Sequence, residues 1–265
     1  MRLSLKVFDY IKDFGFVHGC KLYLAKNFST DLVLKYPYFK YPVYFRNLAT
    51  KSDIIMFRQI FVSKDYNITV PFNPEIILDL GANVGFASIY FSNRFPAAKI
   101  FALEPNADNY KMACKNTQNY VNVKMVQGAI WNSNEKVHGV DKGFGEAAFM
   151  IASGNGEGTI NAYTIDDVLK DMNVQSADII KIDIEGSEKE IFEKGFENWM
   201  PKTKIIIVET HDRYRRGTSK SVLSAISKYN FSLELSGENL VFYNNELINP
   251  YKRLLQFCYL SLLFN

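Results

Sequence analysis

The stretch that decides the fold is Ile76–Gly85, IILDLGANVG. Ile76, Ile77 and Leu78 lead into Asp79 without polar alternation, which is typical of a strand buried on both faces of a parallel sheet. A glycine-rich turn follows, and the next segment, VGFASIYFSNRF, has apolar residues at helical spacing. Strand, turn and helix predict the start of a βαβ unit, which binds ligands beyond the carboxyl ends of its strands.

The sequence of this turn can be compared with the patterns that bind two kinds of cofactor. A dinucleotide requires G-x-G-x-x-G, so that the pyrophosphate approaches the backbone, but Asn83 and Phe86 occupy the second and third glycine positions. The spacing fits an acidic residue followed by Gly-x-Gly-x-Gly, with Asp79, Gly81 and Gly85 around Asn83. Asn tolerates a left-handed backbone better than most non-glycine residues. This second pattern is that of a turn for S-adenosylmethionine (SAM), whose ammonium an acid at the strand end suits.

A second acidic residue, Glu104, ends the next predicted strand, Lys99–Glu104. Its carboxylate is placed to accept hydrogen bonds from both ribose hydroxyls of SAM. The alternative is a structural βα turn that binds no ligand. Acids at the carboxyl ends of two successive strands argue against that alternative, because a doubly wound sheet keeps its site at this edge.

The composition is that of a globular protein, with 48% hydrophobic and 22% charged residues in a chain of 265. A net charge of +3 without a basic stripe excludes nucleic acid as an expected partner. Three cysteines without metal or disulfide spacing favour a reducing compartment. The first residues lack the apolar core of a signal peptide, and no apolar run approaches a membrane span. The expected location is therefore the cytoplasm.

The chain is predicted to have three parts: an N-terminal appendage over 1–70, a SAM-dependent methyltransferase domain over 71–249, and an apolar helix over 250–265. The C-terminal helix is too short to span a membrane. We expect it to pack on protein, where it offers a route to a homo-oligomer.

The appendage is expected to contain helices and a hairpin. Apolar residues recur at helical spacing within Met1–Asn27, whereas Asp31–Phe45 is aromatic and β-branched, as in a short hairpin or edge strands. A further helix is predicted to start at Ser52 or Asp53, either of which can cap it.

Predicted strands and helices alternate in the main domain. The strands are Ile76–Leu80, Lys99–Glu104, Val123–Gln127, Asp178–Ile184 and Lys204–Glu209, followed by an antiparallel pair, Phe231–Leu235 and Leu240–Tyr243. The helices are Val84–Arg94, Asn106–Asn119, a short one capped by Thr164 and Asp167, one that starts after Glu185, and Ser219–Tyr229. The pattern predicts an α/β, doubly wound, mostly parallel seven-stranded Rossmann-like sheet with an N-terminal helical and hairpin appendage.

One glycine-rich stretch, Asp141–Gly158, interrupts the alternation. Its length without a clear period makes it a candidate binding loop or lid, and a plain solvated hairpin is the equal alternative. Short strands are expected near Val137–Val140 and Ala147–Ile151.

Acidic side chains and one histidine end two further strands. Asp183 and Glu185 follow one strand, and Glu209 and His211 repeat the same spacing on the next. Alternate residues of a strand share a face, so each pair points to one side. Charges that end apolar strands are costly unless they bind something. The four residues are therefore candidates for catalysis, although Glu185 can also cap the following helix and Glu209 can bond to backbone amides.

In this order along the chain, DLGANVGFAS, FALEPN, TIDDVL, IKIDIEGSE and IVETH resemble the FkbM family of SAM-dependent methyltransferases. The upstream YPVYFRNLATKSDIIMFRQIF resembles the segment that precedes the core in that family. The resemblance runs from Tyr41 to His211. It implies O-methylation, usually of a sugar hydroxyl in a glycan, glycolipid or natural product. The glycine-rich loop and the chain beyond Asn249 have no counterpart in it.

The resemblance also implies a cofactor site. The methionyl side of SAM is expected at Asp79, Gly81, Asn83 and Gly85, the ribose at Glu104 and Asn106, and the adenine at Gly128, Ala129 and Ile130. Ser88 and Asp183 complete the expected cofactor-binding set.

Methyl transfer needs a positioned acceptor oxygen and help with its proton, because an alcohol is a poor nucleophile at neutral pH. His211 is the first candidate base by its ordinary pKa, and Asp183 is the second. In related sugar and catechol methyltransferases, acids at such strand ends hold Mg²⁺. Asp183, Glu209 and His211 are candidate ligands here, although Mg²⁺ prefers oxygen.

The leading interpretation is a SAM-dependent O-methyltransferase acting on a carbohydrate or another small-molecule acceptor. A nicotinamide-dependent oxidoreductase is a second possibility, weakened by Asn83 and Phe86. A catalytically inactive, methyltransferase-like binding module is a third, and the five candidate groups Asp79, Glu104, Asp183, Glu209 and His211 argue against it.

Overall fold

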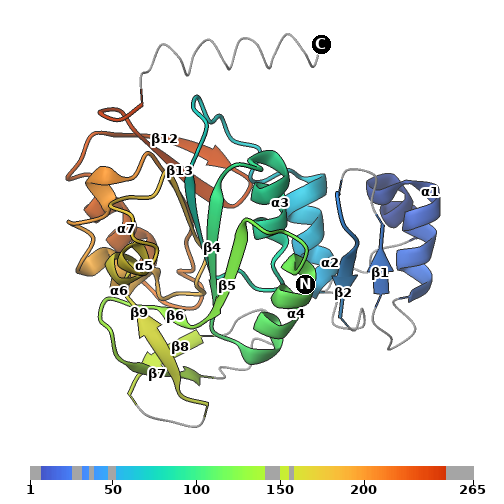
Figure 1. The fold of residues 1–265 in the computed structure, drawn as a ribbon, viewed down its shortest axis with the longest axis horizontal. Coiled ribbons are helices and arrows are strands. Elements are labelled where there is room, and N and C mark those ends of the chain that lie inside the picture. The colour runs from blue at the N-terminus through green and yellow to red at the C-terminus, as the bar shows by residue number, and fades with distance from the viewer. Residues whose placement is uncertain are drawn as a thin grey trace.

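A seven-stranded sheet forms the centre of the computed structural model, which describes residues 7–25, 32–35, 39–46, 52–140, 150–154 and 158–248 (Figure 1). The strand order is β12-β13-β11-β10-β3-β4-β5. The five strands from β11 to β5 in this order are parallel, and β13 pairs antiparallel with both β11 and β12. The strands are β3 (Ile76–Leu80), β4 (Lys99–Glu104), β5 (Val123–Gln127), β10 (Ile179–Ile182), β11 (Ile205–Glu209), β12 (Phe231–Ser236) and β13 (Asn239–Asn244). The predicted doubly wound class is confirmed.

Successive strand residues point to opposite faces of the sheet and enter two separate cores. Ile77, for example, belongs to one core and Leu78 to the other. The first core lies against α3 (Phe86–Arg94) and α4 (Ala107–Thr117), and the second against α5 (Ile165–Asp171), α6 (Glu188–Glu193), α7 (Thr218–Ile226) and the short 3₁₀ turn η2 (Met200–Lys202). Figure 1 shows these helix groups on the two sides of the sheet. Both faces are covered at the centre of the sheet, which is why a strand such as β11 (IIIVE) carries no polar residue before its end.

Two predicted helix starts are confirmed in detail. The Asn106 side chain accepts hydrogen bonds from the backbone N–H groups of Asp108 and Asn109, which begins α4. Thr164 and Asp167 form a reciprocal capping box at the start of α5. Because α4 starts directly after β4, its first turn lies beside the strand end that carries Glu104.

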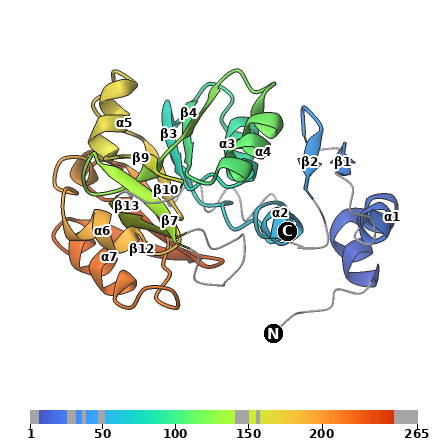
Figure 2. The same ribbon diagram turned by 90° about the horizontal axis from the view of Figure 1, so that it is seen from below.

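The N-terminal elements pack into the first core. They are α1 (Val7–Ala25), interrupted at Gly15 (φ 74°), the antiparallel pair β1 (Leu32–Leu34) and β2 (Val43–Phe45), and α2 (Ser52–Phe57), which continues as a π-helix, η1 (Arg58–Val62). The Phe57 and Phe86 ring centroids lie 5.6 Å apart, joining α2 to α3. Figure 2 shows α1 and the β1–β2 pair as a lobe to one side of α3 and α4. The division at residue 70 stays a prediction.

A smaller sheet lies beyond β5. Its order is β6 (Ala129–Ile130), β9 (Ile160–Tyr163), β7 (Lys136–Val140) and β8 (Met150–Ser153). The sequence predicts β7 and part of β8, but not β6 and β9, which are too short for alternation to show. Most of the glycine-rich loop (141–149 and 155–157) and the C-terminal segment from 249 to 265 lie outside the described residues. The predicted lid and apolar helix therefore stay predictions.

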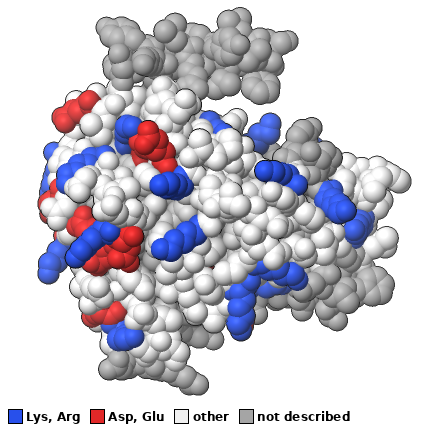
Figure 3. Space-filling model, in the orientation of Figure 1, with Lys and Arg blue, Asp and Glu red and all other residues white. Residues whose placement is uncertain are grey.

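None of the helices in the described part of the chain has the length and apolar content needed to cross a bilayer. On the face drawn in Figure 3, Lys and Arg are dispersed rather than gathered into one patch.

Candidate functional site

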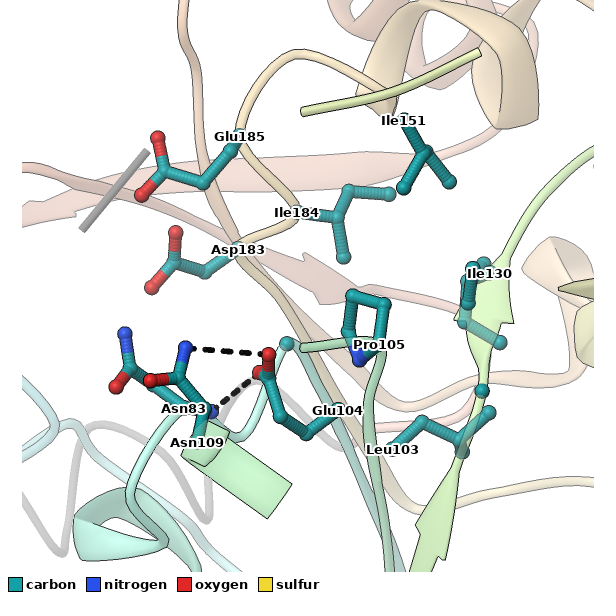
Figure 4. Close-up of a pocket in the computed structure, with 13 residues that line it drawn as sticks. Asn83, Leu103, Glu104, Pro105, Asn109, Ile130, Ile151, Asp183, Ile184 and Glu185 are labelled. Atoms are coloured by element: carbon teal, nitrogen blue, oxygen red, sulfur yellow. Dashed lines mark hydrogen bonds between the residues drawn. The ribbon is translucent and has the colours of Figure 1, made fainter. Parts of the chain in front are cut away.

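The first cavity of the site opens at the carboxyl ends of β3, β4 and β10 (Figure 4). Seven of the predicted cofactor residues line it: Gly81, Asn83, Glu104, Gly128, Ala129, Ile130 and Asp183. Glu185, predicted as catalytic, lines it too. Figure 4 shows Asp183 and Glu185 beside each other on one side of the cavity, and the apolar side chains of Ile130 and Ile151 on the other.

The turn after β3 has the backbone that its sequence predicts. Gly81, Asn83 and Gly85 all have positive φ, of 82°, 48° and 85°. A Cβ built on Gly81 would collide with the carbonyl oxygen of Asp183, so only glycine fits where the turn meets the end of β10. Gly85 has another role. A Cβ there would lie 3.2 Å from the Ala113 Cα, so this glycine lets α3 approach α4 and does not line the cavity.

Glu104 is held firmly at the cavity wall. Its side chain is 4% exposed, and its oxygens accept hydrogen bonds from the backbone N–H groups of Asn83 (2.8 Å) and Asn106 (2.9 Å) and from the Asn109 amide (3.3 Å). Burial raises the pKa of Glu104 to about 7, despite the opposing effect of these hydrogen bonds. Asn106 serves as the cap of α4 and does not line the cavity. Asn109 does, although its position inside a predicted helix gave no signal of this.

Asp79 and Ser88 lie behind the cavity rather than in its lining. Asp79 is fully buried, accepts a hydrogen bond from the Ser88 hydroxyl (2.6 Å), and pairs with the Lys181 ammonium (3.2 Å). Asp79 was expected to contact the ammonium of SAM. In the structure its carboxylate is paired with the Lys181 ammonium instead, so the geometry does not support that contact.

Lys181 is a site residue that the sequence interpretation missed. Its ammonium donates to the Gly81 carbonyl (2.6 Å) and lies 3.6 Å from the Asp183 carboxylate. Burial alone would lower the pKa of Lys181, but the charges of Asp79 and Asp183 raise it above its ordinary value. A lone lysine in the otherwise apolar IIKI was the available signal, since such a cation needs partners when buried.

A second cavity, of about 290 Å³, adjoins the first. The two share three lining residues, Asn83, Asp183 and Glu185. The other walls of the second cavity come from α2 and η1, from Asp65 and Tyr66, from Glu209 and Arg213 after β11, and from the turn between β12 and β13. Two ligands, one bound in each cavity, would therefore meet at the end of β10.

The four predicted catalytic residues come together at this junction. The His211 ring is 2% exposed, and its Nε2 lies 3.7 Å from Asp183, 3.5 Å from Glu185 and 3.4 Å from Glu209. Its Nδ1 lies 2.9 Å from Glu188. Glu188 is a further residue missed from the sequence, where an acid at the start of a helix needs no other explanation.

The charges of the cluster affect the protonation of the His211 ring. Burial alone would lower the pKa of the imidazole, but hydrogen bonds to Glu188 and Glu209 and the charges of Glu188 and Asp183 raise it to about 11. These interactions favour the protonated ring, whose Nε2 donates rather than accepts, and the role of His211 as the base stays a prediction. Burial and the charge of Asp183 raise the pKa of Glu185 to about 8, and burial also raises the pKa of Glu209.

The same cluster contains the predicted candidates for a metal site. One ligand atom from each of Asp183, Glu209 and His211 lies within 4.8 Å of the others. Two carboxylates and an imidazole form a donor set that a divalent cation can use, provided that Nε2 gives up its proton.

Comparisons with known proteins identify the family of this chain. The profile of the FkbM methyltransferase domain matches residues 79–233, more than half of the chain. The methyltransferase sdnD of Sordaria araneosa is 26% identical over 191 residues, which cover 58% of this chain and 73% of that protein. The hexuronic acid methyltransferase AglP of Haloferax volcanii is 25% identical over 175 residues, covering 62% and 66% respectively.

Among solved structures, a methyltransferase FkbM from Methylobacillus flagellatus KT superimposes with a TM-score of 0.47 at 15% identity. The superposition covers 71% of this chain and 47% of that one, so the chain spans less than half of that protein.

Proposed function

Because this chain belongs to the FkbM family of methyltransferases, we propose that it transfers the methyl group of SAM to a hydroxyl of a carbohydrate. The observation that carries the proposal is the junction of the two cavities at Asn83, Asp183 and Glu185. A cofactor in the first cavity and an acceptor in the second would bring their reacting atoms together there. Such alignment supplies much of the acceleration of a displacement reaction.

The first cavity fits SAM in its distribution of polar groups. The carboxylates of Glu104 and Asp183 suit donors such as ribose hydroxyls and an ammonium, and the buried Asn83 Oδ1 has no hydrogen-bond partner within the described residues. Leu103, Ile130 and Ile151 provide an apolar wall for a purine ring. The family uses SAM as its methyl donor, and the residues present suit that ligand.

The chain's own residues then supply proton transfer and orientation. When bound, SAM supplies an electrophilic methyl group. The carboxylates of Asp183 and Glu185 lie at the junction, where one of them accepts the proton of the attacking hydroxyl. His211, whose Nδ1 lies 2.9 Å from Glu188, places Nε2 3.4–3.7 Å from Asp183, Glu185 and Glu209, where a protonated ring would offset the repulsion among these carboxylates. With SAM bound, the acceptor oxygen would gain the methyl group as its proton passes to the carboxylate, and S-adenosylhomocysteine (SAH) would be left as the demethylated product.

The sugar acceptor is supported by one relative, AglP, whose name describes a hexuronic acid methyltransferase. A divalent cation on Asp183, Glu209 and His211 is a second way to activate the hydroxyl. It is favoured by the closeness of their ligand atoms.

Calorimetry with SAM, SAH and NAD⁺ tests the cofactor. We expect binding of SAM and SAH and none of NAD⁺. Transfer of a labelled methyl group to a panel of glycosides tests the reaction, with mass spectrometry locating the label on an oxygen. Asp183→Asn should lower turnover by roughly 10²–10⁴-fold, the usual contribution of a general base. Failure to bind either SAM or SAH would overturn the proposal.

A further inference from the structure

The second cavity, which the proposed function assigns to the acceptor, has an excess of negative charge. Among its described lining residues, Arg213 is the one cation, against five carboxylates: Asp65, Asp183, Glu185, Glu209 and Glu238. Arg213 lies over the Tyr214 ring, 4.6 Å from its centroid. The cavity wall therefore favours a ligand that brings positive charge.

The inner and outer carboxylates differ in their partners. Asp183, Glu185 and Glu209 lie within 3.7 Å of His211 or Lys181. Asp65 and Glu238 form no ion pair with any described residue, and Glu238 accepts one hydrogen bond, from the Gln59 amide (3.1 Å). Burial, followed by the charge of Glu238, raises the pKa of Asp65, so these two groups repel each other. A cation between them would relieve that repulsion.

A neutral acceptor group in this cavity calls for a ligand that donates a hydrogen bond, as an ammonium does. Asn239 lines the cavity and is only 4% exposed. Its amide donates to the Ser236 carbonyl (3.2 Å), but its Oδ1 is buried and has no hydrogen-bond partner within the described residues. A buried acceptor left unpaired costs free energy, which a donor on the ligand would recover.

This outer wall is fixed in place. The Ser236 hydroxyl donates to the Asp65 backbone carbonyl (2.8 Å), and a Cβ on Gly237 would collide with the Asp65 carboxylate. Asp65 thus packs against the turn between β12 and β13, beside Glu238 and Asn239. All three residues lie outside the segment 79–233 that matches the family profile.

We propose that the acceptor is an aminated sugar, whose protonated amino group binds between Asp65 and Glu238 while its hydroxyl reaches the Asp183–Glu185 pair. The inference rests on the proposed function and narrows its substrate class. A uronic acid would bring a carboxylate into an already acidic cavity and is disfavoured.

Binding of three simple probes tests the inference. The methyl glycosides of glucosamine and glucuronic acid each differ from methyl glucoside in one group, the amino group at C2 or the carboxylate at C6. Their dissociation constants are measured by NMR titration of the full chain saturated with SAH, in EDTA and again with Mg²⁺. We expect the glucosamine glycoside to bind at least ten-fold more tightly than the glucoside. The uronate should bind most weakly of the three.

Variants that remove charge but keep shape make the test specific. Asp65→Asn and Glu238→Gln should each reduce the preference for the amino sugar about five-fold or more. Glu197→Gln removes the same charge at an exposed residue outside both cavities and should leave the preference unchanged. Arg213→Gln should strengthen the preference.

Three outcomes would overturn the inference. The first is that the glucoside or the uronate binds as tightly as the amino sugar or more tightly. The second is that neither Asp65→Asn nor Glu238→Gln changes the preference for the amino sugar over the glucoside. The third is that the uronate becomes the preferred ligand when Mg²⁺ is added. Each presumes that SAH binds. Absence of SAH binding would instead overturn the proposed function, so the two failures are distinguishable.

Discussion

The Glu188 carboxylate contacts the His211 ring at Nδ1, with Oε1 at 2.9 Å, and both side chains are buried. The same carboxylate accepts hydrogen bonds from the backbone N–H groups of Ile184 (3.0 Å) and Gly186 (2.8 Å). One buried group therefore fixes both the ring and the loop that carries Glu185. This orientation directs Nε2 toward the cavity junction.

Glu188→Gln should keep the packing but weaken this hold. We expect turnover to fall by roughly 10–100-fold, since small displacements of a reacting group are costly, with the affinity for SAH almost unchanged. The loss of the negative charge should also lower the pKa of His211, which proton NMR follows directly. An unchanged His211 titration with full turnover would show that Glu188 has no orienting role.

Glu104 should make stability depend on pH. Its pKa is about 7 in the folded protein, above its ordinary value of 4.5, so the folded state binds more protons between these values. The free energy of unfolding should therefore fall as pH rises from about 4.5 to 7, by roughly 3 kcal/mol at most.

Urea denaturation at several pH values measures that slope. Glu104→Gln should flatten it, because the amide does not titrate. Asp108→Asn, at an exposed residue nearby, is the matched control and should leave the slope as it is. A wild-type slope that persists in Glu104→Gln would assign the pH dependence to other groups.

Glu185 adopts a left-handed backbone with φ of 55°, unusual for a residue with a Cβ. Such strain costs about 1–2 kcal/mol and tends to persist at functional sites. Glu185→Gly should therefore raise the free energy of unfolding by roughly 1 kcal/mol while it lowers methyl transfer. Denaturation and turnover are measured on the same preparations. Asn173→Gly replaces another residue with φ of 55°, outside both cavities, and should leave turnover intact.

Methyl transfer should survive removal of divalent cations. His211 Nε2 already lies within 3.7 Å of three carboxylates, and Mg²⁺ prefers oxygen ligands. We expect turnover in EDTA to stay within about two-fold of that with Mg²⁺. Loss of activity in EDTA and its return with Mg²⁺ would assign the activation of the hydroxyl to a metal on Asp183, Glu209 and His211.

The sequence predicts the sheet well because its strands are buried on both faces. Ile76–Leu80, Lys99–Glu104 and Val123–Gln127 have the predicted bounds. The convergence of Asp183 with His211 was also predictable, since the carboxyl ends of parallel strands meet at one edge.

Side-chain partners were harder to predict than strand ends. The position of Asp79 at a strand end does not reveal that Lys181, about a hundred residues later, occupies its carboxylate. Glu188 already has an adequate explanation as the first residue of a helix. The outer wall of the acceptor cavity depends on packing between residues 52–66 and the β12–β13 turn, a long-range contact that no local pattern encodes.

The contact between Gly81 and the Asp183 carbonyl has a consequence for redesign. It is made by main chain alone, so the spacing between the cofactor turn and the end of β10 does not depend on any side chain in the acceptor cavity. If the proposed function holds, the residues of 52–66 and of the β12–β13 turn that line the second cavity can be exchanged to accommodate a different sugar while this spacing is kept. Gly81→Ala would instead push the turn and the end of β10 apart and would displace Asn83 and Asp183, which line both cavities.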